Sequence, residues 1–142
     1  MSEGERRPLL IERPIVVRTY DIDFANIVHN IVYFRWLEDL RSEILADVRP
    51  IAEILTTGIS PILTASAIEY QWPVRIGDAV VGRMWVAELS RTRWTLAAEI
   101  VVGRQVCAAA RQSGYFAELK TLRPVRVPER LQAAWAKEIE HG

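Results

Sequence analysis

The chain has one cysteine, two histidines and no net charge, and each of these shortages excludes a class of protein. Cys107 has no second cysteine to pair with, so an intrachain disulfide is impossible. One cysteine and two histidines are too few for a usual structural zinc site, and we expect no metal. The 18 basic residues balance 18 acidic residues, so charge gives no reason to expect nucleic acid or an anionic membrane as partner.

Long hydrophobic runs are also missing. No uncharged apolar segment approaches the roughly 20 residues that a membrane-spanning helix needs, so we expect no membrane insertion. The residues from Met1 to Arg7 carry charges without an apolar segment behind them, unlike a signal peptide. We therefore expect a cytoplasmic protein with one domain over residues 1–142, of which residues 1–9 form a poorly ordered lead.

The residue patterns predict one strand, one long helix and four further strands. β-Branched residues favour a strand at about 12–20, and apolar residues at helical spacing predict a helix at about 30–48 and a short one at 51–55. Alternation and turn residues predict strands at about 62–71, 78–89, 93–102 and 105–118, then a C-terminal helix at about 128–140. Gly103-Arg104 fits a two-residue hairpin. This order is typical of an α+β domain with the helix on one antiparallel sheet.

Polar residues gather where the first strand meets the long helix. Asp21, Asp23, His29 and Asn30 lie within ten positions of one another. The start of a helix has backbone N–H groups without partners and favours negative charge, so acids beside it can face a site that stabilises an oxyanion. The same acids can instead cap the helix or build a turn, since aspartate is common in both roles.

The spacing Asp21-x-Asp23-x-x-Asn26-x-Val28-x-Asn30-x-x-Tyr33 resembles the signature of hotdog-fold acyl-CoA thioesterases, in the branch of 4-hydroxybenzoyl-CoA thioesterase. Two later segments are similar to that family in the same order. They are Tyr70-x-x-Pro73-x-x-x-Gly77-Asp78 and Arg123-Pro124-x-x-x-Pro128. The resemblance covers roughly residues 13–130 and implies a hotdog fold, in which a five-stranded antiparallel sheet wraps a long central helix.

The resemblance implies hydrolysis of an acyl-CoA or acyl-carrier-protein thioester to a free acid and a thiol. Asp23 matches the family's catalytic carboxylate and would act as nucleophile or general base. An N–H near Asn30 or Ile31 would polarise the thioester carbonyl. Asn26 stands where the family has glycine, and asparagine is the next best residue for a left-handed backbone position.

Other residues near the motif leave two interpretations open. Asp21 can be a turn-forming side chain. His29 can act as a base, a common role of histidine, or it can pack or contact substrate. Glu38 is the rival to Asp23, because a different branch of hotdog enzymes uses a helix glutamate, but it can instead pair with Arg35 or Arg41 at helical neighbour spacing.

The resemblance also implies a substrate site and a partner. Tyr33 and Leu37 would line the acyl pocket, and Arg91 and Arg93 would meet the phosphates of coenzyme A, which enters as part of the substrate rather than as a cofactor. We expect a homodimer or homotetramer. Two other functions stay open: a hotdog hydratase or dehydratase, and a non-catalytic module that binds acyl thioesters.

Overall fold

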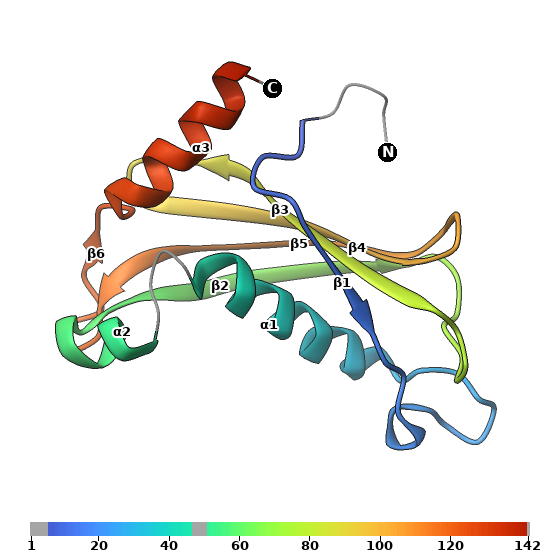
Figure 1. Ribbon diagram of the computed structural model, residues 1–142. Helices are drawn as coiled ribbons and strands as arrows, with labels where there is room; N and C mark the ends of the chain where they lie inside the picture. Colours follow the sequence, from blue (N-terminus) through green and yellow to red (C-terminus); the bar gives the residue numbers. More distant parts are fainter. Residues whose placement is uncertain (1–5, 47–50, 142) are drawn as a thin grey trace.

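The computed structural model describes residues 6–46 and 51–141, and one antiparallel sheet dominates it (Figure 1). The strands follow the spatial order β1-β3-β4-β5-β2, and β6 pairs with β5. They are β1 (Ile11–Ile15), β2 (Ile59–Tyr70), β3 (Val80–Leu89), β4 (Arg93–Val102), β5 (Gln105–Glu118) and β6 (Pro124–Val125). The helices are the 3-10 helix η1 (Thr19–Asp21) and the α-helices α1 (Asn30–Ala46), α2 (Ile51–Thr57) and α3 (Glu129–His141).

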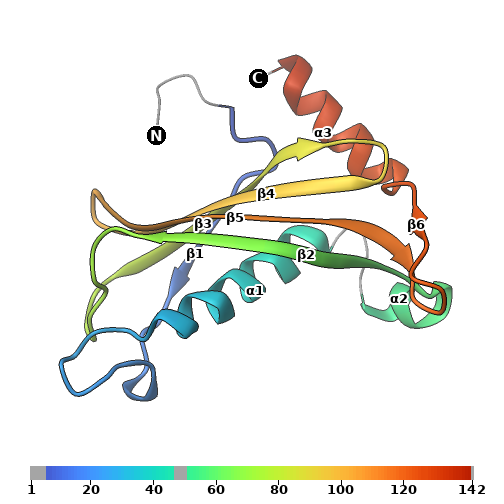
Figure 2. The same cartoon turned by 180° about the vertical axis from the view of Figure 1, so that it is seen from behind.

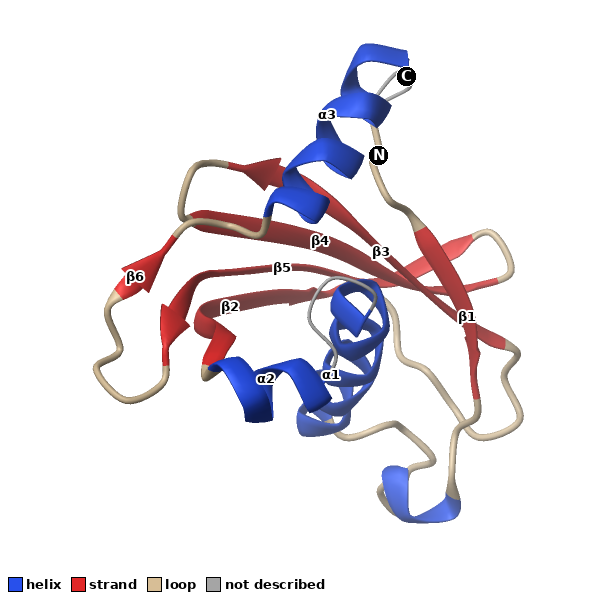
Figure 3. Cartoon of the chain, turned by 60° about the vertical axis from the view of Figure 1, so that its left-hand side comes forward, coloured by secondary structure: helices blue, strands red, loops and turns tan. Residues whose placement is uncertain are grey.

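Helix α1 packs its apolar face on one face of the sheet, and the sheet curves over it (Figure 3). Alternate residues of β3 and β4 point into this core, as their two-residue period predicts. Gly82 of β3 allows the close approach of α1, because a Cβ there would lie 2.9 Å from a methyl group of Leu40. The buried residues between α1 and these strands are Val32, Tyr33, Trp36, Leu37, Leu40, Ile44, Leu45, Val80, Met84, Val86, Trp94, Leu96, Ala98 and Ile100.

Most predicted elements are confirmed, and the sheet differs in strand number and bounds. It has six strands rather than the predicted five. The additional strand, β6, begins at Pro124 and has only two residues, which is too short for a sequence pattern to predict. Strand β1 ends at Ile15 rather than near residue 20, because residues 19–21 form a 3-10 turn closed by hydrogen bonds between Arg18 and Asp21. Gly103 has a φ of +60°, which confirms the predicted hairpin. The predicted end of the long helix, at residue 48, lies outside the described residues.

The expectation of a helix enclosed by the sheet needs a correction. The sheet covers α1 on one side, and the flank of the helix that carries Ile31 and Phe34 is exposed. A sheet on one face can bury only one stripe of a helix, so two large apolar side chains stay open in the single chain. None of the helices in the described ranges is long and apolar enough to cross a membrane.

Residues 6–9, the described part of the lead that we expected to be poorly ordered, pack on the sheet. The carbonyl of Pro8 accepts the N–H of Val86 at 2.9 Å, next to the indole of Trp135, which donates to the Val86 carbonyl at 2.9 Å. The Arg7 guanidinium lies 4.1 Å from the ring centre of Trp85 and 3.1 Å from a carboxylate oxygen of Glu99. Residues 1–5 lie outside the described part of the chain.

Candidate active site

The acidic motif folds into a small hairpin directly before α1. The His29 N–H donates to the carbonyl of Asp21 at 3.0 Å, Ile22 pairs with Val28, and the Asp23 N–H donates to the carbonyl of Ile27 at 3.0 Å. Residues 21–23 therefore run antiparallel to residues 27–29. The hairpin brings Asp23, His29 and Asn30 to the same end of the molecule, at the start of α1.

Asn26 turns the chain at the tip of this hairpin. Its φ of +59° lies in the left-handed region, which confirms the expectation that asparagine keeps the turn at this position. The side-chain oxygen of Asn26 accepts the N–H of Ile76 at 2.9 Å. The Val28 N–H also donates to the carbonyl of Val74 at 2.9 Å, so the hairpin is fixed to the loop between β2 and β3.

The two aspartates of the motif have different surroundings. Asp21 is buried, and its Oδ2 accepts the backbone N–H of Arg18 at 2.8 Å, which is the turn-forming role. Asp23 is partly exposed, and its Oδ1 accepts the N–H groups of Ala25 at 2.8 Å and Ile27 at 3.1 Å. Among the described residues, nothing donates to Oδ2 of Asp23 and no cation pairs with it. One oxygen thus fixes the carboxylate, and the other can act chemically.

The first turn of α1 offers unused donors beside the hairpin. Within the described ranges, the N–H groups of Asn30 and Ile31 have no acceptor, while Val32 donates to the carbonyl of His29 at 3.0 Å. The side chains of His29 and Asn30 are exposed. The Tyr70 hydroxyl donates to the Asn30 carbonyl at 3.1 Å, which ties the helix start to the end of β2. The free N–H groups can stabilise a negatively charged oxygen.

Tyr33 lies inside the core of the single chain. Only 3% of it is exposed, and its ring packs edge to face against Trp36 and Tyr70, with 5.1 Å between ring centres in both pairs. Burial raises the pKa of Tyr33 to about 12, because the phenolate would lose its hydration. Leu37 is buried as well. Neither residue meets solvent here, and their contact with an acyl group stays a prediction.

Glu38 and Cys107 have contacts that favour structural roles. The Glu38 carboxylate accepts a hydrogen bond from Arg41, one of the two arginines that its spacing suggested. Cys107 is fully buried, and burial raises the pKa of its thiol, which disfavours the reactive thiolate. Among residues 6–46 and 51–141, no three His, Cys, Asp or Glu side chains come close enough together to hold a metal ion.

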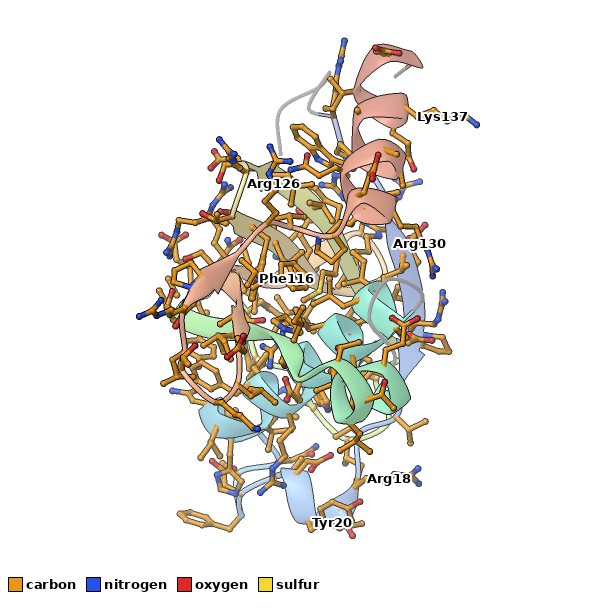
Figure 4. The ribbon with its side chains drawn as sticks, turned by 90° about the vertical axis from the view of Figure 1, so that its left-hand side faces the viewer. Arg18, Tyr20, Phe116, Arg126, Arg130 and Lys137 are labelled. Carbon is orange, nitrogen blue, oxygen red and sulfur yellow. The ribbon has the colours of Figure 1, made fainter. Side chains whose placement is uncertain are left out.

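Arg91 and Arg93 lie far from the hairpin. Strand β3 starts beside the loop that holds Asn26 and ends before Arg91, and ten residues of strand span roughly 30 Å. Figure 4 shows the same separation, with Arg18 and Tyr20 at one end and Arg126 toward the other. Within one chain, the structure therefore does not bring these arginines to Asp23.

A surface groove of ≈ 780 Å³ lies at that far end. Arg91 and Arg126 line it, together with Glu129 and the first turn of α3. Sequence reasoning missed Arg126, although it lies inside the Arg123-Pro124-x-x-x-Pro128 segment that resembles the family. That segment positions it, because the Val127 N–H donates to the carbonyl of Arg91 at 2.8 Å.

Known proteins share this fold. The chain is similar to an Aquifex aeolicus (strain VF5) protein named "Putative esterase", with 27% identity over 80% of this chain and 88% of that protein. The structure superposes on the 1,4-dihydroxy-2-naphthoyl-CoA thioesterase Slr0204 of Synechocystis with a TM-score of 0.80 and 18% identity, over 89% of this chain and 96% of that one. The Staphylococcus aureus protein SAV2348, solved in complex with CoA, gives a TM-score of 0.82 and 14% identity, over 98% of this chain and 87% of that one.

A sequence match to a family model assigns this chain to a family, and the assignment agrees with the α+β architecture of these hotdog-fold relatives. The family model described as the thioesterase-like superfamily matches residues 17–135, which contain the hairpin, α1 and the whole sheet except β1. The chain belongs to the thioesterase-like superfamily.

Proposed function

We propose that this protein hydrolyses an acyl-CoA thioester to a free acid and coenzyme A, with Asp23 as nucleophile or general base. The observation that carries the proposal is the Asp23 carboxylate, held through Oδ1 and without a partner for Oδ2 among the described residues, in the hairpin that directly precedes the unused N–H groups of α1. Membership of the thioesterase-like superfamily supports the reaction class. Two structural relatives, a CoA thioesterase and a protein solved in complex with CoA, support CoA as the leaving group.

The chemistry needs a base or nucleophile on one side of the carbonyl and a donor on the other. The thioester oxygen would accept the N–H of Asn30 or Ile31, and such a donor contributes ~3 kcal/mol as negative charge develops on that oxygen. Asp23 would then attack the carbonyl carbon, giving a mixed anhydride that water hydrolyses, or take a proton from an attacking water. In both routes the C–S bond breaks and the thiolate leaves as CoA after gaining a proton.

We propose further that two chains share the site. Strand β2 is an edge of the sheet (Figure 2). Residues Ile59–Ile68 on that edge carry no charge, and the middle of the strand is exposed. An exposed uncharged edge invites pairing with a second copy. The exposed side chains of Ile31 and Phe34 on α1 and of Tyr70 at the end of β2 support an apolar contact there.

Antiparallel pairing of two β2 strands would bring Asp23 of one chain to the same end of the paired strands as Arg91 and Arg93 of the other chain. Asp23 lies near the end of β2 marked by Tyr70, whereas Arg93 is level with Ile62 toward the other end of β2, because both residues stand opposite Tyr115 of β5. A twofold axis across β2 would lay one half of the strand beside the opposite half of its partner. The groove with Arg91 and Arg126 would then offer cations for the phosphates of a CoA bound at the other subunit.

Thiol release from a panel of acyl-CoA and acyl-carrier-protein thioesters tests the function. We expect release of CoA from at least one acyl-CoA by the wild type and none above background by Asp23→Asn. Hydration of an enoyl-CoA without thiol release would favour a hydratase instead. Binding of acyl-CoA without either reaction would favour a non-catalytic module.

A further inference from the structure

A chain of four polar side chains crosses from α1 to the exposed edge of the sheet. The amide oxygen of Gln112 accepts a hydrogen bond from Arg41 at 3.0 Å, and its amide nitrogen donates to the Ser66 hydroxyl oxygen at 3.0 Å. Arg41 also donates to Glu38, at the exposed end of the chain. Ser66 and Gln112 stand directly opposite each other in the β2–β5 ladder. We call these four residues the edge network.

Stability alone gives a weak reason for this arrangement. Gln112 is 97% buried, with only 3% of its surface exposed, so its amide needs partners that an apolar side chain would not. Replacing buried polar networks with apolar residues is often neutral or stabilising. Buried polar residues at an interface are instead known to specify register and partner, at some cost in stability.

The edge beside this network has little else to define a register. The exposed centre of β2 reads Leu63-Thr64-Ala65-Ser66-Ala67, without charge or bulky aromatic side chains. A slip of two residues between two such strands keeps every side chain on its own face, so the hydrophobic pattern opposes it weakly. Polar groups at fixed positions along the edge are needed to distinguish one register from the next.

We propose that the edge network sets the register in which two β2 strands pair, and this rests on the dimer proposed above. Because the Ser66 oxygen accepts the Gln112 amide, its own O–H is directed away from that bond and can donate across the interface. Glu38 and Arg41 place one acid and one base on the flank of α1 that also carries the exposed Ile31 and Phe34. An acid and a base on one flank are complementary to a second copy turned by a twofold axis. A second copy shifted along β2 by two residues would lose both the hydrogen bond from Ser66 and the pairing of Glu38 and Arg41 with the opposite charges.

A spin-label distance measurement tests the register directly. The single label is attached at Glu69→Cys, which is exposed on β2, in a Cys107→Ala background so that no other thiol is present. We expect one narrow distance between the two labels of the dimer. In Gln112→Leu the dimer should persist by light scattering, with added distances offset by roughly 6–7 Å, the length of two strand residues.

The control is Glu43→Gln, which breaks a comparable ion pair with Arg13 on the opposite flank of α1 and should leave the single distance unchanged. Ser66→Ala is the second variant and carries the test if Gln112→Leu fails to fold. A single unchanged distance in the folded variants would overturn the proposal. A monomeric labelled background would overturn both the register and the dimer, while thiol release by that monomer would leave the hydrolase assignment standing.

Discussion

The side-chain oxygen of Asn26 accepts the backbone N–H of Ile76 at 2.9 Å, which joins the hairpin of the acidic motif to the loop before β3. The contact depends on the left-handed backbone of Asn26, because that conformation turns the chain at the hairpin tip. One residue thus shapes the turn that holds Asp23 and anchors it to the sheet.

Replacements of Asn26 should separate these two contributions. Asn26→Gly keeps the left-handed backbone and loses the side-chain hydrogen bond, so we expect a loss of about 1 kcal/mol in the free energy of unfolding. Asn26→Ala loses the bond and also adds about 1–2 kcal/mol of backbone strain. Urea unfolding of the wild type and of both variants measures the order of their stabilities. Equal stability of the alanine and glycine variants would contradict a strained backbone at this position.

Asp23→Asn should abolish hydrolysis while the protein stays folded. Asparagine keeps the Oδ1 acceptor for the N–H groups of Ala25 and Ile27, and it removes the negative charge that the reaction needs. We expect kcat to fall at least ~100-fold, the usual scale for a general base or nucleophile. Asp78→Asn is a matched control, since the Asp78 carboxylate holds the neighbouring loop through the Arg75 N–H at 2.8 Å. Near wild-type kcat in Asp23→Asn would move the chemistry to Glu38 or His29.

The regular elements could be predicted from the sequence because their signals are local. The two-residue alternation in 93–102 and 105–118 gave β4 and β5 with their observed bounds. Strand β6 and the 3-10 turn at Thr19–Asp21 were missed, because two- and three-residue elements depend on tertiary hydrogen bonds rather than on a repeating pattern.

The candidate site was only partly visible in the sequence. The turn at Asn26 could be predicted, since few residues other than glycine tolerate a left-handed backbone. The distance from Asp23 to Arg91 could not, because sequence spacing does not reveal that the two residues end up at opposite ends of β3. The placement of Arg126 depends on the hydrogen bond between Val127, just after β6, and Arg91 in the β3–β4 turn, 36 residues apart in the chain, for which no local pattern exists.

Glu38→Gln should reduce kcat less than Asp23→Asn does. The Glu38 carboxylate is exposed and paired with Arg41, so its loss removes a surface ion pair worth less than about 1 kcal/mol. We expect a change in kcat below about 5-fold, within the range that such an energy allows. Steady-state thiol release at matched stability measures both variants. A greater loss in Glu38→Gln would assign the chemistry to the helix carboxylate.

The raised pKa of Tyr33 predicts a loss of stability in alkali. The unfolded phenol titrates near 10, and burial raises the pKa of Tyr33 to about 12 in the folded chain. Between these values the unfolded chain releases a proton that the folded chain keeps. The contribution of Tyr33 is therefore complete below pH 10 and is lost as the pH rises to about 12, by up to about 1.4 kcal/mol per unit. Urea unfolding between pH 9 and 11.5 measures the slope, which Tyr33→Phe should reduce.

The protein should be a dimer or a larger assembly at micromolar concentration, with β2 in the interface. The exposed part of β2 has unpaired backbone groups and no charge to repel a second copy, and exposed Phe34 and Ile31 lie on the adjoining flank of α1. Ala65→Pro adds a residue that cannot donate to a new ladder, while Ala65→Thr is the control with strong strand propensity. Light scattering should give at least twice the 16.2 kDa chain mass for the wild type and the threonine variant, and a lower mass for the proline variant. A monodisperse wild type near 16.2 kDa that still releases thiol would contradict the shared site, because Asp23 would then work without arginines from a second chain.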